Sequence, residues 1–485
     1  MTPGPLLRSF IVKNRLERLV GLIVLGLTGL AALLLWLAVA SSTHPDTEEH
    51  KGVLFGAWSV IYDTQAPSLR VLLVAIAVAL VCAAGLGFLE YRVMTTYRRS
   101  TNARGLPLAP RVVMADTKGR FEGEVTVTVL VPAHNEEASL PATLTSLAQQ
   151  VPPPQRVVVV ADNCTDRTVA IARAHGADVF ETVDNTHKKG GGLNQALRHL
   201  LPQQGENDVV MVMDADTMLD PGFLASAVRR FSEDRGLMAV GGVFYGEDGH
   251  GLIGQFQRNE YIRYGRELRR RRGKVFVLTG TASMFRPRAL RTVAAERGSS
   301  IPGLRGDVYD TAALTEDNEL TIALKSLGAL TISPSECTVV TELMPSWRLL
   351  WHQRLRWQRG ALENLGAYGV TPQTIRYWAQ QLGIGYGVFA LWAYFALLVV
   401  MLLATDRWVW FTFWVGLGGL FMAERVVTVW RGGWKARLVA LAIFPELFFD
   451  AFLQLVYVKG VVDISLNRQA GWTHVEHRTP QESTR

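Results

Sequence analysis

The sequence has few cysteines and few charged residues for its length. Only three cysteines occur among 485 residues. Cys82, Cys164 and Cys337 are odd in number, far apart and at no spacing typical of a metal site, which excludes a disulfide framework. Charged residues make up 19% of the chain, below the roughly 25% usual in soluble proteins. The 49% hydrophobic content excludes an intrinsically disordered chain and a collagen-like fibre.

The chain is basic, with a formal net charge of +7. A basic balance is compatible with nucleic-acid binding, but a membrane protein also carries an excess of cytoplasmic Lys and Arg. We favour the second explanation and expect no nucleic-acid partner. The length allows either two to three soluble domains or one large catalytic domain with a membrane part.

Long apolar runs near both ends predict membrane-spanning helices. The runs without a charged residue are Leu19–Thr43, Val71–Leu89, Tyr377–Thr405 and Trp408–Ala423. The first two are each long enough to cross about 30 Å of hydrocarbon as a helix. A further stretch, Leu438–Val458, is apolar but contains Pro445, Glu446 and Asp450. It is compatible with a span, a re-entrant pair of half-helices or an interfacial helix.

The first apolar run is compatible with a cleaved signal peptide, but its length and the second run favour an uncleaved anchor. Arg and Lys flank the two runs on their outer sides, whereas the loop between them is mainly acidic. By the positive-inside rule, the N-terminus and residues 92–376 face the cytoplasm. We therefore expect a multi-pass protein of the cell (inner) membrane.

The predicted organisation has five parts. They are two N-terminal transmembrane helices in 1–91, a cytoplasmic domain in 92–345, interfacial amphipathic helices in 346–376, a C-terminal transmembrane region of two or three segments in 377–460, and a tail in 461–485.

The cytoplasmic part alternates strand-like and helix-like segments. Strands are predicted at Val125–Val131, Arg156–Ala161 and Asp208–Met213, and helices at Ala138–Gln150, Thr165–His175 and Leu193–Leu200. Strands separated by helices indicate a mostly parallel α/β sheet. Polar clusters follow the three strands: His134–Glu137, Asp162–Asn163 and Asp214–Asp216. Ligands of such sheets bind at the carboxyl ends of the strands, so we predict a nucleotide or phosphate site there.

Four motifs carry potential chemistry. Asp214 and Asp216 follow an apolar strand and are suited to a divalent cation whose shell substrate phosphates complete, although a surface turn is the alternative. Lys189 lies in a glycine-rich entry to a helix, which suits a phosphate or is a solvated loop. Glu316 and Asp317 precede the helical stretch 319–327, where acidic residues also favour the helix dipole. Gln353–Trp357 is compatible with a basic amphipathic helix on a membrane surface.

In order along the chain, these motifs resemble those of the processive membrane-embedded family-2 glycosyltransferases, which include cellulose, hyaluronan, chitin and poly-N-acetylglucosamine synthases. The resemblance covers about residues 125–360. It rests on Val131–Glu137, Asp162, Lys189, Asp214–Asp216, Thr279–Gly280, Phe285–Arg286, Thr315–Asp317 and Gln353–Trp357. The segment Glu342–Arg348 looks closest to poly-N-acetylglucosamine synthases. Ala161–Asp166 departs from the usual pair of adjacent aspartates, although Asp162 remains.

The resemblance implies a GT-A domain, inserted between transmembrane helices, that transfers sugar from a UDP-sugar with inversion. Asp317 would be the general base, with Glu316 beside it. Asp214 and Asp216 would bind Mg²⁺ or Mn²⁺. The nucleotide would be held by Pro132, Ala133, His134, Asn135, Glu136, Asp162, Lys189 and Asp214. The diphosphate and acceptor side would be formed by Gln353, Arg354, Arg356 and Trp357, with Gln353 and Arg356 facing the diphosphate and Trp357 stacking on the acceptor sugar.

The expected function is synthesis of a β-linked polysaccharide from UDP-N-acetylglucosamine or UDP-glucose, with translocation of the product. The expected partners are the UDP-sugar, the growing polysaccharide, the lipid bilayer and a possible small membrane subunit. One alternative is a non-processive transferase that adds one sugar to a lipid or polyprenyl-phosphate acceptor. A second is a nucleotide-binding transporter or scaffold without catalysis, which the presence of Asp214, Asp216 and Asp317 disfavours.

Overall fold

A computed structural model describes most of the chain beyond residue 122, together with short pieces near the N-terminus. The chain divides into two compact units, 1–107 with 393–420 and 108–392 with 421–485. Most of the first predicted span, Leu19–Thr43, and the tail 469–485 lie outside the described residues. The described residues are 29–30, 32–34, 36–37, 40, 50–54, 58–62, 70–71, 73–78, 80–81, 84–85, 123–271, 273–404 and 412–468.

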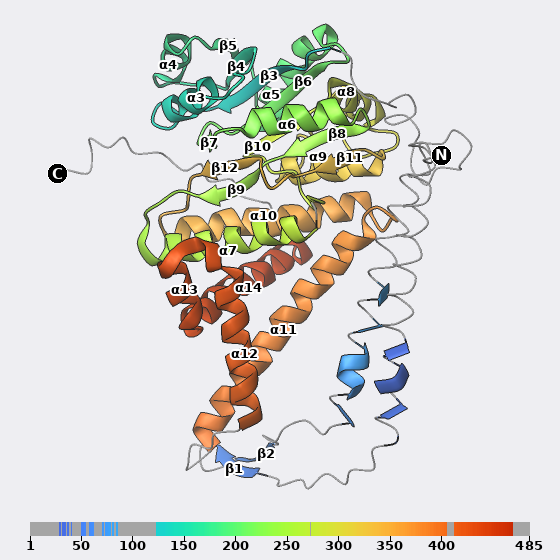
Figure 1. Ribbon diagram of the computed structural model, residues 1–485, viewed down its shortest axis with the longest axis vertical. Helices are drawn as coiled ribbons and strands as arrows, with labels where there is room; N and C mark the ends of the chain where they lie inside the picture. The colour runs from blue at the N-terminus through green and yellow to red at the C-terminus, as the bar shows by residue number, and fades with distance from the viewer. Residues whose placement is uncertain are drawn as a thin grey trace, which may run out of the picture. The chain divides into compact units, whose positions relative to one another are not determined.

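The centre of the second unit is a seven-stranded sheet with the strand order β11-β8-β10-β6-β3-β4-β5 (Figure 1). Neighbouring strands are parallel except at β10, which runs antiparallel to β6 and β8. The predicted mostly parallel sheet is confirmed. Its strands are β3 (Thr126–Ala133), β4 (Arg156–Ala161), β5 (Asp178–Glu181), β6 (Asp208–Met213), β8 (Leu237–Gly241), β10 (Ala282–Phe285) and β11 (Leu330–Ile332).

Both faces of this sheet are covered by helices, as the continuous apolar runs of its central strands require. Leu130 and Val210 pack with helices on one face, and Val129 and Met211 pack with helices on the other. The first face is covered by α5 (Lys188–Leu200), α8 (Pro287–Glu296) and α9 (Glu316–Ser326), and the second by α3 (Leu140–Ala148), α4 (Thr168–Ala174) and α6 (Phe223–Glu233).

The predicted helices at 138–150 and 165–175 are shorter in the structure, at 140–148 and 168–174, and two further boundaries differ next to the polar clusters. β3 continues through Pro132 to Ala133, because both residues still pair with β4. The helix expected to begin at Leu193 begins at Lys188, so its glycines are helical. A methyl group at Gly191 would collide with the Asn185 side chain, which explains why a helix carries glycine there.

A smaller sheet and two long helices lie beside the main sheet. The sheet has the order β7-β12-β9, with β7 at Thr217–Leu219, β12 at Thr338–Thr341 and β9 at Val243–Gly246. The helices are α7 (Gly251–Arg270) and α10 (Trp347–Tyr368) (Figure 1). The C-terminal part is helical, with α11 (Ile375–Ala404), α12 (Thr412–Thr428), α13 (Gly433–Leu441) and α14 (Phe444–Ser465). In the first unit, β1 (His50–Leu54) and β2 (Trp58–Tyr62) pair antiparallel.

The stretch Leu438–Val458 contains a sharp bend. The helices of Trp430–Leu441 and Phe444–Ser465 meet at 89°. Ile443 has a left-handed φ of 47°, and Pro445 in the first turn of α14 has no N–H to continue the preceding helix. This bent pair together has the length and hydropathy of a membrane span, which no single helix among the described residues has.

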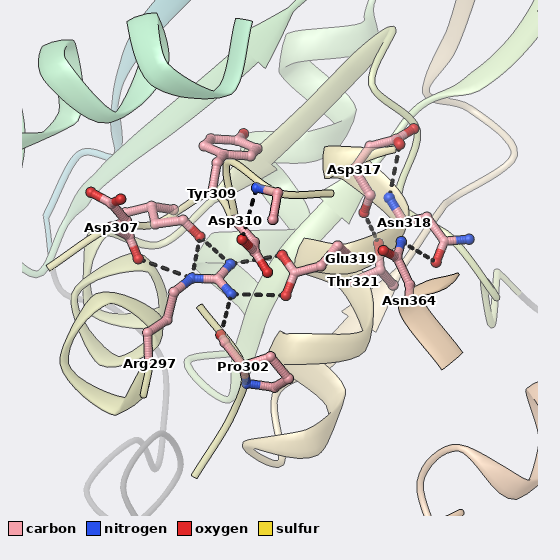
Figure 2. A network of polar contacts seen from close by, with 12 residues as sticks. Arg297, Pro302, Asp307, Tyr309, Asp310, Asp317, Asn318, Glu319, Thr321 and Asn364 are labelled. Atoms are coloured by element: carbon pink, nitrogen blue, oxygen red, sulfur yellow. Dashed lines mark hydrogen bonds and ion pairs between the residues drawn. The ribbon is translucent and has the colours of Figure 1, made fainter. Parts of the chain in front are cut away.

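A buried ion pair holds α9 in place (Figure 2). Arg297 is 0% and Glu319 is 1% exposed, and the guanidinium donates to the two carboxylate oxygens at 2.8 and 2.7 Å. Arg297 also donates to the carbonyls of Pro302 at 2.8 Å and Val308 at 2.6 Å, and the Tyr368 hydroxyl of α10 donates to Glu319 at 2.5 Å. One ion pair therefore joins α9, α10 and the segment 302–308.

We expect Glu319→Gln to lower the free energy of unfolding by about 3–5 kcal/mol, because Arg297 would be left as a buried, unpaired charge. Urea unfolding of the full chain, followed by far-ultraviolet circular dichroism, measures this change. The pair of Arg156 and Asp178 provides the control, since its side chains are 49% and 57% exposed. Asp178→Asn should cost less than about 1 kcal/mol. Equal losses in the two variants would contradict the prediction.

Candidate active site

Three neighbouring parallel strands place their carboxyl ends at one edge of the sheet. β4, β3 and β6 are adjacent in that order. Pro132 and Ala133 are the last residues of β3, and 134–136 follow them. Asp162 follows β4, and Asp214 follows β6. The structure therefore brings the three polar clusters of the sequence to a single edge, where α/β sheets bind ligands.

Asp162 is a largely buried carboxylate, 9% exposed, with one oxygen held by three donors. Oδ1 accepts hydrogen bonds from the Thr182 hydroxyl at 2.8 Å, from Asn185 Nδ2 at 2.8 Å and from Asn163 Nδ2 at 3.2 Å. The ring nitrogen Nδ1 of His134 lies 2.5 Å from the Asp162 carbonyl oxygen. These contacts fix the orientation of the carboxylate before any ligand arrives.

The loop after β3 is held by contacts to the two following helices. Asn135 has a left-handed φ of 57°, and its Oδ1 accepts a hydrogen bond from the Thr165 amide at 2.8 Å. The Glu136 amide donates to the Thr168 hydroxyl at 2.8 Å, and its carboxylate accepts from the Ser139 hydroxyl at 2.6 Å. Ser139 directly precedes α3, so the Glu136 side chain is bonded at the start of that helix.

A second group of polar residues surrounds Lys189 at the start of α5. Its Nζ lies 2.6 Å from Asp214 Oδ1 and 3.4 Å from Glu316 Oε1. The Gly280 amide donates to Asp317 Oδ2 at 3.1 Å. A Cβ at Gly280 would lie 3.4 Å from Lys189 Nζ and 3.3 Å from Asp317 Oδ2. Residues far apart in the sequence thus line one small cavity.

The pKa values of the two acidic residues that open α9 are shifted in opposite directions. Burial raises the pKa of Glu316, but Lys189, a backbone hydrogen bond and Arg356 together hold that pKa below its usual value. Burial also raises the pKa of Asp317, and the neighbouring charge of Glu316 raises it further. Asp317 is therefore the more basic carboxylate and Glu316 the partner of the lysine.

Asp216 is the second carboxylate after β6. Burial, then Asp214, then Glu136 and Glu342, raise its pKa to about 7. An acidic surrounding of this kind favours a cation. In the described part of the chain, however, no three Asp, Glu, His or Cys side chains are placed to hold a metal ion by themselves. Asp214 and Asp216 thus fit a hard divalent cation only if other ligands, such as phosphate oxygens, complete its shell.

Tyr309 lines the same cavity, and the sequence analysis did not find it. The residue is 3% exposed and lies beside Lys189 and Asp317. Asn194 of α5 fixes its backbone, since Oδ1 accepts from the Val308 amide at 3.0 Å and the Tyr309 amide at 2.8 Å. Asn194 Nδ2 donates to the Tyr309 carbonyl at 2.9 Å. Tyr309 lies in an irregular segment without periodicity, so no sequence pattern could have identified it.

The two arginines of the predicted motif Gln353–Trp357 on α10 face different partners. Arg356 lies close enough to Glu316 to help lower the pKa of that carboxyl. Arg354 instead pairs with Glu260 of α7, with N–O distances of 3.0 and 2.8 Å. The Arg354 guanidinium also lies 4.4 Å from the centroid of the Trp357 ring. Within this motif, Arg356 therefore acts on the Glu316 carboxylate through its charge, whereas Arg354 forms an ion pair with α7.

The N-terminus of α9 and the middle of α10 are in close contact. Asn364 Nδ2 donates to the Thr315 carbonyl at 3.2 Å, and any side chain at Gly360 would collide with Thr315. On the same helix, Gln353 Oε1 is buried and has no hydrogen-bond partner among the described residues. Gln353 is thus an unsatisfied acceptor one residue before Arg354.

The sheet order and the site at its carboxyl edge define a GT-A-like α/β domain. A solved structure with this fold is a mannosyltransferase from Pyrobaculum calidifontis in complex with GDP-Man and Mn²⁺. It superposes with a TM-score of 0.50 at 18% sequence identity. The match covers 78% of this chain and 95% of the mannosyltransferase chain. Residues 128–294 match the family model described as Glycosyl transferase family 2, so this part of the chain is a family-2 glycosyltransferase domain.

Two curated relatives agree with this assignment. A probable glycosyltransferase of Bacillus subtilis is 30% identical over 241 residues, which are 48% of this chain and 54% of the relative. The poly-beta-1,6-N-acetyl-D-glucosamine synthase of Staphylococcus aureus is 24% identical over 280 residues, which are 56% of this chain and 63% of that protein. The chain thus matches between half and two thirds of the length of these relatives.

We expect Asn194→Ala to loosen the segment 302–313 without unfolding the domain, because three hydrogen bonds to Val308 and Tyr309 disappear. Hydrogen exchange of the full chain, read by mass spectrometry, should show faster exchange in that segment. Gln195 is the matched control, because it bonds through its side chain to the backbone of Val183. Gln195→Ala should accelerate exchange only around Val183. Unchanged exchange at 302–313 in Asn194→Ala would contradict the prediction.

Proposed function

We propose that the protein is an inverting, metal-dependent glycosyltransferase that polymerises a β-linked polysaccharide from a UDP-sugar and translocates it. The observation that carries this proposal is that Lys189 and Asp317 line one cavity while the same lysine pairs with Asp214, which follows β6 at the carboxyl edge of the sheet. The similarity to a poly-beta-1,6-N-acetyl-D-glucosamine synthase supports polymer synthesis.

Asp317 is suited to the role of general base. Its carboxylate is oriented by the Gly280 amide, and its raised pKa makes it a better proton acceptor than an exposed aspartate. In the proposed reaction it takes the proton of an acceptor hydroxyl while that oxygen forms a bond to the anomeric carbon. The bond from that carbon to the diphosphate breaks on the opposite face, and its electron pair leaves with UDP. One displacement of this kind inverts the configuration.

The nucleotide would lie along the edge formed by β4, β3 and β6. Asp162 and the loop from Pro132 to Glu136 would bind uridine and ribose, and Lys189 would bind the diphosphate. Lys189 already pairs with Asp214, so a diphosphate there would meet a lysine held in place by a carboxylate. Asp214 and Asp216 would hold Mg²⁺ or Mn²⁺, which supplies charge neutralisation for the leaving diphosphate. The solved mannosyltransferase structure contains Mn²⁺.

The acceptor would bind along α10. Arg356 and Gln353 would face the diphosphate. Arg354 would stay paired with Glu260 beside the Trp357 indole, and that indole would stack on the acceptor sugar. A stacking aromatic at this point favours retention of a growing chain and hence a processive enzyme. The alternative is a non-processive transferase that adds one sugar to a membrane lipid or polyprenyl phosphate.

We further propose that the chain is a multi-pass protein of the cell membrane, with its catalytic domain in the cytoplasm. Large apolar side chains face outward on α13 and at the start of α14. Trp434 is 68%, Leu438 is 56% and Phe444 is 70% exposed, whereas Ala436 and Ala440 on the inner side of α13 are 0% exposed. A helix with its bulky apolar residues outward is suited to a bilayer interface.

If the membrane proposal is correct, the chain will resist extraction. Membranes from cells that express it would be washed with alkaline carbonate, and the chain should stay in the pellet because apolar helices are held by hydrocarbon. A peripheral protein would be released. Recovery of most of the chain in the supernatant would contradict this part of the proposal.

The proposed activity predicts UDP release from one donor. The full chain, purified in detergent, would be assayed with Mn²⁺ and with UDP-glucose, UDP-N-acetylglucosamine or UDP-glucuronate, and the product sized on a gel. Release with a high-mass product is the expected result. In the same assay, Asp317→Asn should lower turnover by about 100-fold or more, the usual contribution of a general base, while calorimetry shows unchanged UDP binding.

Asp178→Asn, far from the site on exposed β5, should leave turnover unchanged. A short or lipid-linked product would favour the single-transfer alternative. Substantial polymer from Asp317→Asn would show that another group is the base. No release with any donor, from a chain that binds UDP, would overturn the proposed activity.

A further inference from the structure

Arg354 is held by one residue of α7. The arginine is 5% exposed, and its two terminal nitrogens face the two oxygens of Glu260 in a parallel, two-bond arrangement. Its third nitrogen, Nε, is buried without a partner in the described part of the chain. The carboxylate of Glu260 therefore supplies the hydrogen bonds that orient this guanidinium.

The oriented guanidinium in turn supports an indole. It lies 4.4 Å from the centroid of Trp357, one helical turn further along α10, and 5.7 Å from the centroid of Tyr261 on α7. Tyr261 is 3% exposed. A cation at this distance from a ring face attracts the ring, so the guanidinium restrains one side of the indole.

The part of α7 that carries Glu260 is itself held in place. Two neighbours of Glu260 on α7 donate hydrogen bonds to the carboxylate of Glu446 at the start of α14. Asn259 donates at 3.0 Å, and Arg263 donates to the two oxygens at 2.7 and 2.6 Å. Glu446 is 2% exposed and also accepts from Arg425 of α12 at 3.2 Å. α7 is thereby anchored to α14, and Glu260 reaches α10 from a rigid base.

We propose that Glu260 is a positioning residue of the acceptor site, which holds Arg354 against Trp357 and so determines how firmly the acceptor sugar is retained. The inference rests on the acceptor role of Trp357 in the proposed function. Without the negative charge of this carboxylate, Arg354 would be a buried cation with no paired anion and would leave its place beside the indole. The residues proposed to hold the nucleotide and the metal ion lie on other elements than α7 and α10 and would keep their geometry.

The test compares Glu260→Gln with Glu267→Gln in the full chain. Glu267 also lies on α7 and pairs with Arg271, but its side chain is 56% exposed. We expect Glu260→Gln to shorten the product by about fivefold, as loss of a cation–π contact predicts, while the KM for the UDP-sugar stays unchanged. Glu267→Gln should change neither. Unchanged product length in a folded Glu260→Gln variant would overturn the inference.

Two further measurements separate positioning from a general structural role. In an Arg354→Gln background, Glu260→Gln should cause no additional shortening, because its effect passes through the arginine; additive effects would overturn the inference. Fluorine NMR of chains labelled with fluorotryptophan reads the indole directly, with the signal assigned by Trp357→Phe. That signal should move in Glu260→Gln and not in Glu267→Gln.

The fluorine signal does not depend on catalysis. A wild-type chain that releases no UDP would overturn the proposed function, while a shifted signal in the same preparation would still support the positioning by Glu260. A signal that stays in place would overturn the positioning by Glu260, whatever the activity of the wild-type chain.

Discussion

The buried pair of Arg297 and Glu319 is the constraint on which the proposed active site depends. Glu319 lies two residues after Asp317 on α9, so the position of the proposed base follows from that of the ion pair. Arg297 also donates hydrogen bonds to the carbonyls of Pro302 and Val308, and Val308 directly precedes Tyr309. A buried pair of this kind contributes little net stability but is costly to break, which suits a role in holding a fixed arrangement.

At the cavity, the positive charge of Lys189 lies among the carboxylates of Asp214, Glu316 and Asp317. Lys189 contacts both Asp214 and Glu316, and it lowers the pKa of the second while burial raises that of Asp317. Two adjacent acids on the first turn of one helix thus acquire opposite properties. The difference comes from which of them faces the lysine, and it gives one of them the character of a base.

The sequence allowed the sheet and the clustering of polar residues to be predicted, because both follow from local patterns. The apolar runs of β4 and β6 have the predicted limits, and strand ends necessarily meet at one edge. The roles of Tyr309, Arg297 and Glu260 could not be predicted. Each depends on a partner that is distant in the sequence, such as Asn194 for Tyr309 or Arg354 for Glu260, and no local pattern records such a pairing.

The reversed direction of β10 affects how the cavity can be reshaped. Because β10 runs against β6, the residues before it, including Gly280, reach the same edge as Asp214, which follows β6. The segments after β3 and β4 lead directly into helices, so their lengths are restricted by the crossover. The connection from α7 to β10 does not join two parallel strands, so its length is not restricted in this way. A change in the length of that connection would alter one wall of the cavity while every parallel crossover keeps its length.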